Sequence, residues 1–261
     1  GVLFISGIIP GLLLAFLFAM AILIWATWKP EIGPKGPRAS WPERLASLGG
    51  MVEILILFLG VMGGLFAGLF TPTEAGAIGA FGTLVFSLLR RSLTWRGFTQ
   101  SLFETTRISC MILVIVAGAT IFGRFLAVSR IPYNIAGWIA ESQLPGWGVM
   151  LLIISVFLVG GFFIDALALI MLTVPIFYPV VTSLGYDPIW FGVVIVLVTQ
   201  MGVITPPVGA NVYIVSGVAR DVPLETIFKG CVPFLLALIV ETLLLILFPQ
   251  IALWLPRLVA Q

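Results

Sequence analysis

The sequence predicts an all-α integral membrane protein with several membrane-spanning helices. Hydrophobic residues make up 61% of its 261 residues and charged residues only 9%, whereas soluble domains carry about 25% charged residues. Stretches close to the roughly 20 apolar residues that cross a bilayer core recur at residues 8–28, 52–70, 75–89, 108–128, 147–164, 189–204 and 232–255. A soluble core cannot bury so many apolar side chains, so we expect lipid to surround this protein.

Composition also limits the chemistry of the chain. The net charge of +2 is too small to indicate a nucleic-acid partner. The sequence contains no histidine, which removes histidine-based zinc sites and Ser-His-Asp triads from consideration within these residues. A membrane-embedded acyl- or phosphotransferase would need a polar catalytic cluster, and the sequence shows none. We therefore expect neither an enzyme nor a cofactor.

Loop charges predict the orientation of the spans, because positively charged loops stay cytoplasmic. Assigning the polar segments alternately to the two sides divides the 13 Lys and Arg residues into a larger group of Lys29, Lys35, Arg38, Arg44, Arg90, Arg91, Arg96, Arg107, Arg220 and Lys229, and a smaller group of Arg124, Arg130 and Arg257. This bias holds only if residues 146–186 enter and leave the membrane on the non-cytoplasmic side. The segment is therefore expected to be a re-entrant hairpin.

This topology divides the chain into five parts. Residues 1–28 would be the last helix of a preceding repeat, and the proline-rich residues 29–50 a cytoplasmic linker with an interfacial helix. Scaffold helices would occupy residues 51–145. A transport domain, made of the hairpin and the broken helix, would occupy residues 146–220. Residues 221–261 would hold an interfacial helix and the terminal span. Short amphipathic pieces are expected along the interface at residues 42–48, 94–105 and 222–228.

A weak internal repeat links the two ends of the chain. The pattern Gly-x-x-Pro-x-Leu-Leu begins at Gly7 and again at Gly230, each time shortly after a Phe. The first copy would cross the membrane inward and the second outward, as in the inverted repeats of secondary transporters. The chain opens at Gly1 in an apolar helix without the charged region of a signal peptide. We interpret it as a fragment that contains one complete repeat and the last helix of another.

The first of two interrupted apolar segments is the predicted hairpin tip. Gly160 and Gly161 interrupt an apolar run, and Asp165 precedes the returning half-helix. Asp is a favoured N-cap residue, while an acidic residue at membrane depth is functional by default. Both interpretations of Asp165 stay open here.

The second interrupted segment divides a long apolar run into two half-helices. Adjacent prolines, which cannot continue a helix, follow Gly202 in a break that contains Thr205, Pro206, Pro207, Gly209 and Asn211. Backbone freed at membrane depth is tolerated where it lines a cavity. Oxygen atoms of Gly202, Thr205 and Asn211 are predicted to bind sodium, and the next half-helix to face an anion with its N-terminus. The alternative is a packing kink.

Two further features have simpler interpretations. The turn formed by Thr71, Pro72, Thr73 and Glu74 ends in a capping pattern, and a tight capped turn accounts for it. Glu241 lies inside the last apolar stretch without an obvious partner. We expect it to pair with another helix or subunit.

Four motifs in this sequence resemble the large membrane subunit of tripartite ATP-independent periplasmic (TRAP) transporters. They are GLFTPTEAGA at residues 68–77, QMGVITPPVG at 200–209, YDPIWFG at 186–192 and PLETIFKG at 223–230. The resemblance covers essentially the whole chain and matches the C-terminal portion of that subunit. It implies a bacterial inner-membrane symporter for organic acids such as dicarboxylates, sialic acid or oxo acids, which works by an elevator motion and uses a sodium gradient.

The same resemblance implies the partners and the position of the site. A periplasmic binding protein would deliver the solute, and a small four-helix membrane subunit would accompany the chain. The hairpin tip would fall on residues 160–165 and the broken helix on 202–211, where one sodium site and half the substrate site are expected. The family's first half, with its own hairpin, is absent. The alternatives are an ion-coupled carrier without a binding protein, against which the motif at 71–77 argues, and a structural subunit, against which the two breaks argue.

Overall fold

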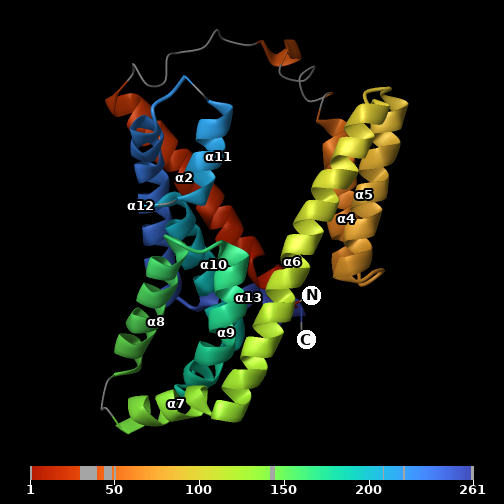
Figure 1. Cartoon of the computed structure of the whole chain (residues 1–261). Helices are drawn as coiled ribbons and strands as arrows, with labels where there is room; N and C mark the ends of the chain where they lie inside the picture. The colour runs from red at the N-terminus through yellow and green to blue at the C-terminus, as the bar shows by residue number, and fades with distance from the viewer. Residues whose placement is uncertain are drawn as a thin grey trace. The chain divides into compact units, whose positions relative to one another are not determined.

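A computed structural model describes residues 2–29, 40–43, 49, 51–141, 145–207, 209–219 and 221–259. The regular structure of these residues is helical, as the sequence predicts (Figure 1). Within the described residues, five helical stretches are long and apolar enough to cross a membrane: Val2–Trp28, Pro72–Leu89, Trp95–Ser129, Ala166–Ser183 and Leu224–Leu247. Three apolar helices are shorter: Val52–Phe66, Gly146–Gly161 and Pro188–Ile204. The chain divides into two compact units, one over residues 33–111 and one over residues 2–32 and 112–261.

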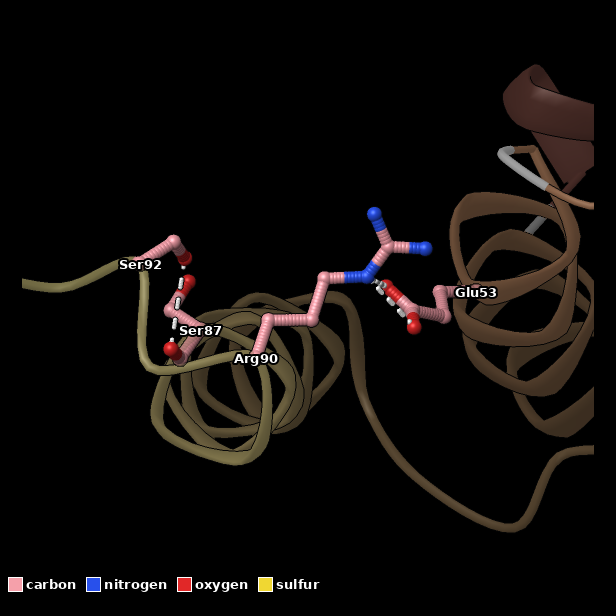
Figure 2. A network of polar contacts seen from close by, with 4 residues as sticks. All are labelled: Glu53, Ser87, Arg90 and Ser92. Atoms are coloured by element: carbon pink, nitrogen blue, oxygen red, sulfur yellow. Dashed lines mark hydrogen bonds and ion pairs between the residues drawn. The ribbon is translucent and has the colours of Figure 1, made fainter.

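The first unit contains a helical hairpin of α4 (Val52–Phe66) and α5 (Pro72–Leu89). The turn between them reverses the chain, so Glu53 near the start of α4 lies beside Arg90, just after the end of α5. Arg90 Nε lies 2.7 Å from the Glu53 carboxylate, and Ser92 Oγ donates to the Ser87 carbonyl at 3.3 Å (Figure 2). The half-exposed ion pair contributes about 0.2–1 kcal/mol. It joins the two helix ends that the charge count assigns to the cytoplasm.

Two predicted interfacial pieces are parts of longer helices. The predicted piece at residues 94–105 continues without interruption into the span at 108–128, which together form α6 (Trp95–Ser129). The piece at 222–228 likewise joins α12 (Leu224–Leu247). Each predicted piece and the span that follows it form one continuous helix, which in α12 runs on through Gly230 and Pro233, so the predicted separation is wrong. Of the piece at 42–48, residues 44–48 lie outside the described part of the chain.

The terminal apolar stretch is divided where the sequence suggested one span. Helix α12 ends at Leu247, and the next residue, Phe248, is not helical, with a φ of −129° and a ψ of 74°. Pro249 follows, and it disfavours the α conformation at the residue before it. A separate helix α13 (Gln250–Val259) then follows. The single predicted span at 232–255 is therefore two helices.

Helix α10 (Pro188–Ile204) lies at the centre of the second unit (Figure 1). It packs against α8 (Gly146–Gly161), α9 (Ala166–Ser183) and α12, and most of its residues are buried. Asp187 starts it by accepting hydrogen bonds from the amides of Ile189 at 2.8 Å and Trp190 at 3.4 Å. Protein buries most of this helix and leaves Val196 and Gln200 exposed. Burial on most sides explains why its sequence is apolar almost all round.

The remaining helices of this unit surround that centre. Helix α2 (Ile8–Trp28) packs along α12, and the rings of Phe18 and Phe234 meet edge to face at 5.1 Å. Helix α1 (Val2–Ser6) contacts α13 and α10, while α7 (Ile131–Glu141) contacts α9 and α11 (Ala210–Val218) contacts α12. The two helices that carry the repeated Gly-x-x-Pro pattern therefore lie side by side. Their inverted-repeat relationship stays a prediction.

Candidate functional site

The predicted hairpin tip is a turn between α8 and α9. Helix α8 ends at Gly161, and the amide of Ile164 donates to the Gly160 carbonyl at 2.9 Å. Asp165 then caps α9, because its Oδ1 accepts from the amides of Leu167 at 3.0 Å and Ala168 at 3.4 Å. The capping role predicted for Asp165 is confirmed. Its carboxylate is exposed at the tip and stabilises the start of the returning helix.

The predicted break follows α10. Thr205 has an extended conformation, with φ of −101° and ψ of 141°, and its amide turns back to the Gly202 carbonyl at 3.1 Å. Its hydroxyl donates to the Met201 carbonyl at 2.5 Å. The bond between Pro206 and Pro207 is cis. Because Pro207 has no N–H, the carbonyl four residues earlier, that of Val203, loses its helical donor.

Gly209 starts the second half of the broken helix. Its φ of +58° lies in the left-handed region, where glycine has no Cβ penalty. A Cβ here would also lie 2.9 Å from Phe228 Cε1. Helix α11 begins at the next residue, and Asn211 occupies an exposed position in its first turn. The break is therefore fixed at one end by the two prolines and at the other by a glycine that no other residue replaces easily.

The hairpin and the broken helix meet through two glycines. A Cβ placed on Gly202 would lie 2.6 Å from Gly161 Cα, and one placed on Gly161 would lie 3.0 Å from Gly202 Cα and 3.3 Å from the Thr199 carbonyl. Gly160 beside it has a different neighbour, since its Cβ would lie 2.7 Å from Leu169 Cδ1 on α9. The hairpin tip and the start of the break thus form one local structure.

Exposure separates the residues of this structure into two groups. Gly161 and Gly202 are buried, and Thr205 is half-buried beside them. Pro206, Pro207, Asp165 and Asn211 are exposed. The contact that joins the hairpin to α10 is one of backbone against backbone rather than one between polar side chains. The close packing of Gly161 and Gly202 was not foreseen, although small residues at helix contacts are typical of membrane proteins.

The turn at residues 71–74 belongs to the first unit and is a capping box. Glu74 Oε2 accepts from the Thr71 amide at 2.7 Å and from the Thr71 hydroxyl at 2.8 Å, and the Glu74 amide donates back to Thr71 Oγ1 at 3.4 Å. Pro72 and Thr73 occupy the first two helical positions of α5. The interpretation of this motif as a capped turn is confirmed.

Comparisons with known proteins agree with the resemblance. The family model described as "Tripartite ATP-independent periplasmic transporter, DctM component" matches residues 1–251. The C4-dicarboxylate TRAP transporter large permease protein DctM of Pseudomonas aeruginosa is 35% identical over 258 residues, which cover 98% of this chain and 60% of that protein. The sialic acid TRAP transporter large permease protein SiaM of Vibrio cholerae is 36% identical over 267 residues, covering 99% and 60%.

A third relative widens the range of named solutes. The ectoine/5-hydroxyectoine TRAP transporter large permease protein UehC of Ruegeria pomeroyi is 34% identical over 254 residues, which cover 97% of this chain and 59% of that protein. The chain thus spans about three fifths of the length of these relatives. All three are named as permease proteins and none as an enzyme, which agrees with the expectation from the residues.

Proposed function

Because the chain belongs to the DctM-component family of tripartite ATP-independent periplasmic transporters, we propose that it forms part of a sodium-coupled permease for small organic anions. The family is one of bacterial inner-membrane proteins, and five helical stretches of the described residues are able to cross a membrane. Two of the relatives are named for C4-dicarboxylates and sialic acid. These solutes share a carboxylate, so we propose a carboxylate as the substrate class.

The contact between Gly161 and Gly202 is the observation that carries this proposal. It sets the hairpin tip against the helix end where the prolines remove backbone donors. In secondary transporters, unwound backbone carbonyls coordinate sodium, and the N-terminus of a half-helix faces an anionic group of the substrate. Gly202, Thr205 and Asn211 are the residues proposed to supply oxygen ligands. The first turn of α11, just after Gly209, is proposed to face the substrate carboxylate.

The residues present suit a hard cation by their chemistry. Carbonyl, hydroxyl and amide oxygens are ligands of hard cations, and the Thr205 hydroxyl keeps its lone pairs while its hydrogen is donated to Met201. Gly160, Gly161 and Asp165 are proposed to act by shaping the tip. Pro206, Pro207 and Gly209 hold the break open.

We further propose the assembly that the resemblance implies. A periplasmic binding protein would deliver the solute, a small membrane subunit would accompany the permease, and the hairpin and broken helix would move as an elevator. A carrier that takes its solute without a binding protein is the second candidate.

Proteoliposomes that contain the full-length permease and its small subunit test these proposals. Uptake of a labelled C4-dicarboxylate and of labelled sialic acid is measured with the binding protein present, and sodium is replaced by choline or potassium at constant pH. We expect uptake to require sodium. Undiminished uptake in choline contradicts the sodium coupling, and equal uptake without the binding protein supports the second candidate.

A further inference from the structure

The apolar part of α12 carries one acidic side chain, and the fold buries it completely. Glu241 has 0% exposure and lies between Leu238 and Leu245 on the helix face that belongs to the hydrophobic core. Trp190 Nε1 of α10 donates to the Leu245 carbonyl at 2.7 Å, so α10 packs along this face. Neither carboxylate oxygen of Glu241 has a hydrogen-bond partner among the described residues. The hydroxyl of the adjacent Thr242 is also buried and unpartnered there.

The described helices that pack against α12 offer no charge to balance an ionised Glu241. Helices α2 and α10 contain no ionisable side chain at all. On α11 the titratable group is Tyr213, which is 50% exposed. On α13 it is Arg257, which is exposed and donates to Gln250 Oε1 at 3.3 Å. An ionised carboxylate at position 241 would therefore be buried without a partner in this part of the structure.

The other ionisable groups of α12 itself are too far along the helix. At 1.5 Å per residue, Cys231 lies about 15 Å and Lys229 about 18 Å from position 241. Lys229 is paired with the exposed Glu225 at 2.8 Å. The chain's own described helices enclose the carboxylate and none of them supplies the pairing that the sequence analysis expected.

We propose that Glu241 is a proton-binding site, carried as a neutral carboxylic acid in the core between α10 and α12. Transfer of an unpaired carboxylate into an apolar interior is strongly unfavourable, and binding a proton avoids this cost. The proton is favoured over a metal cation because a cation needs several oxygen ligands, whereas the unpartnered oxygens here are those of Glu241 and Thr242. Loss of the proton would place a charge on the face that packs against α10. Helix α12 is thus a pH-sensitive support of α10, the helix that ends at the break.

Infrared spectroscopy and thermal unfolding of the purified full-length protein in detergent test this proposal. At neutral pH we expect a protonated-carboxyl band that is present in the wild type and absent from Glu241→Gln. The melting temperature of the wild type should fall by several degrees as the pH rises, because ionising the buried acid costs free energy only in the folded state. Glu241→Gln should show little of this fall. The matched control is Glu225→Gln, an exposed site on the same helix, which should keep both the band and the fall.

Three results would overturn the proposal. The first is a protonated-carboxyl band that is equally strong in Glu241→Gln and the wild type. The second is a melting temperature with the same pH dependence in both proteins. The third is stabilisation by added sodium at constant pH in the wild type but not in Glu241→Gln, which would identify the ligand as a cation. If the variant is not recovered from membranes, the wild type labelled with side-chain carboxyl-¹³C glutamate must show a shifted band, and an unshifted band refutes the assignment.

Discussion

Gly161 and Gly202 bring the backbones of α8 and α10 so close that neither position has room for a side chain. The hypothetical Cβ of Gly202 lies 2.6 Å from Gly161 Cα, well inside van der Waals contact. Both glycines are buried, and each is the last or nearly the last residue of its helix before an irregular segment. The hairpin tip and the break are therefore positioned by one backbone contact. Any separation of the two helices would move both segments.

We expect Gly202→Ala to lower both stability and transport. The added methyl group would meet backbone atoms of Gly161, which cannot rotate away as a side chain can. Overpacking of this kind costs about 1–3 kcal/mol. The melting temperature in detergent should fall, and uptake per inserted molecule should fall further because the tip moves away from the break. Both quantities are measured on protein quantified in the membrane.

Gly148→Ala provides the control for this variant. Gly148 lies in the first turn of α8, and a Cβ there would make ordinary contacts of 3.7 and 3.8 Å with the Pro145 ring. Its stability and uptake should stay close to those of the wild type. If Gly202→Ala behaves like Gly148→Ala, the close contact is unimportant and the two segments are held together in another way.

Local chemistry made the two irregular segments predictable, whereas tertiary contacts did not follow from it. Adjacent prolines must end a helix, and Asp before an apolar helix caps it, so the break and the tip fall where the residues placed them. The contact between Gly161 and Gly202 joins residues far apart in sequence. Glycine alone does not say whether it serves a turn, a bend or a close approach.

Helix ends without strong signals were less predictable. The sequence analysis predicts two segments where the structure has the single long helix α6, because the first part of this helix is more polar. No residue between the two segments stops a helix. The end of α12 at Leu247 is not predicted for the opposite reason, since the apolar run continues through Pro249. Hydropathy reports what surrounds a segment, while backbone chemistry decides where the helix stops.

Thr71→Ala should destabilise the hairpin of α4 and α5 by about 1 kcal/mol, the usual cost of losing an N-cap side chain. The variant loses the bond from the Glu74 amide to Thr71 Oγ1 and the bond from the Thr71 hydroxyl to Glu74. Thr71→Ser retains the hydroxyl and should recover most of the loss. Thermal unfolding of the three proteins in detergent provides the comparison. Equal melting temperatures for the alanine and serine variants would show that the capping box contributes little.

The predicted topology places residue 40 in the cytoplasm and residue 183 in the periplasm. Ser40 is exposed, and its amide donates to Glu43 Oε2 at 2.7 Å, while Ser183 lies in the last turn of α9. A single cysteine at each position, in a background without Cys110 and Cys231, is treated on whole cells with a thiol reagent that does not cross membranes. We expect labelling of Ser183→Cys, and labelling of Ser40→Cys only after the cells are permeabilised. The reverse pattern would invert the orientation.

The sodium site is tested most directly by Thr205→Ala and Asn211→Ala. Thr205→Ala removes a hydroxyl next to the freed backbone of the break, and Asn211→Ala removes an exposed amide oxygen from the first turn of α11. The loss of one polar ligand costs about 1–3 kcal/mol, so the apparent sodium affinity should weaken roughly tenfold or more. Sodium-dependent uptake is measured as a function of sodium concentration in proteoliposomes, at constant pH and equal protein content.

Two further variants separate a sodium site from a packing kink. Pro206→Ala restores a backbone N–H and should let the helix partly re-form, which would withdraw the free carbonyls and reduce uptake while the protein still inserts. The control is Val196→Ala. Val196 lies in the same helix α10 and is 48% exposed, so this variant should leave the sodium dependence unchanged. A kink that serves packing alone predicts a different result. In that case Thr205→Ala and Asn211→Ala would transport with wild-type sodium dependence, or would fail only because the protein no longer reaches the membrane.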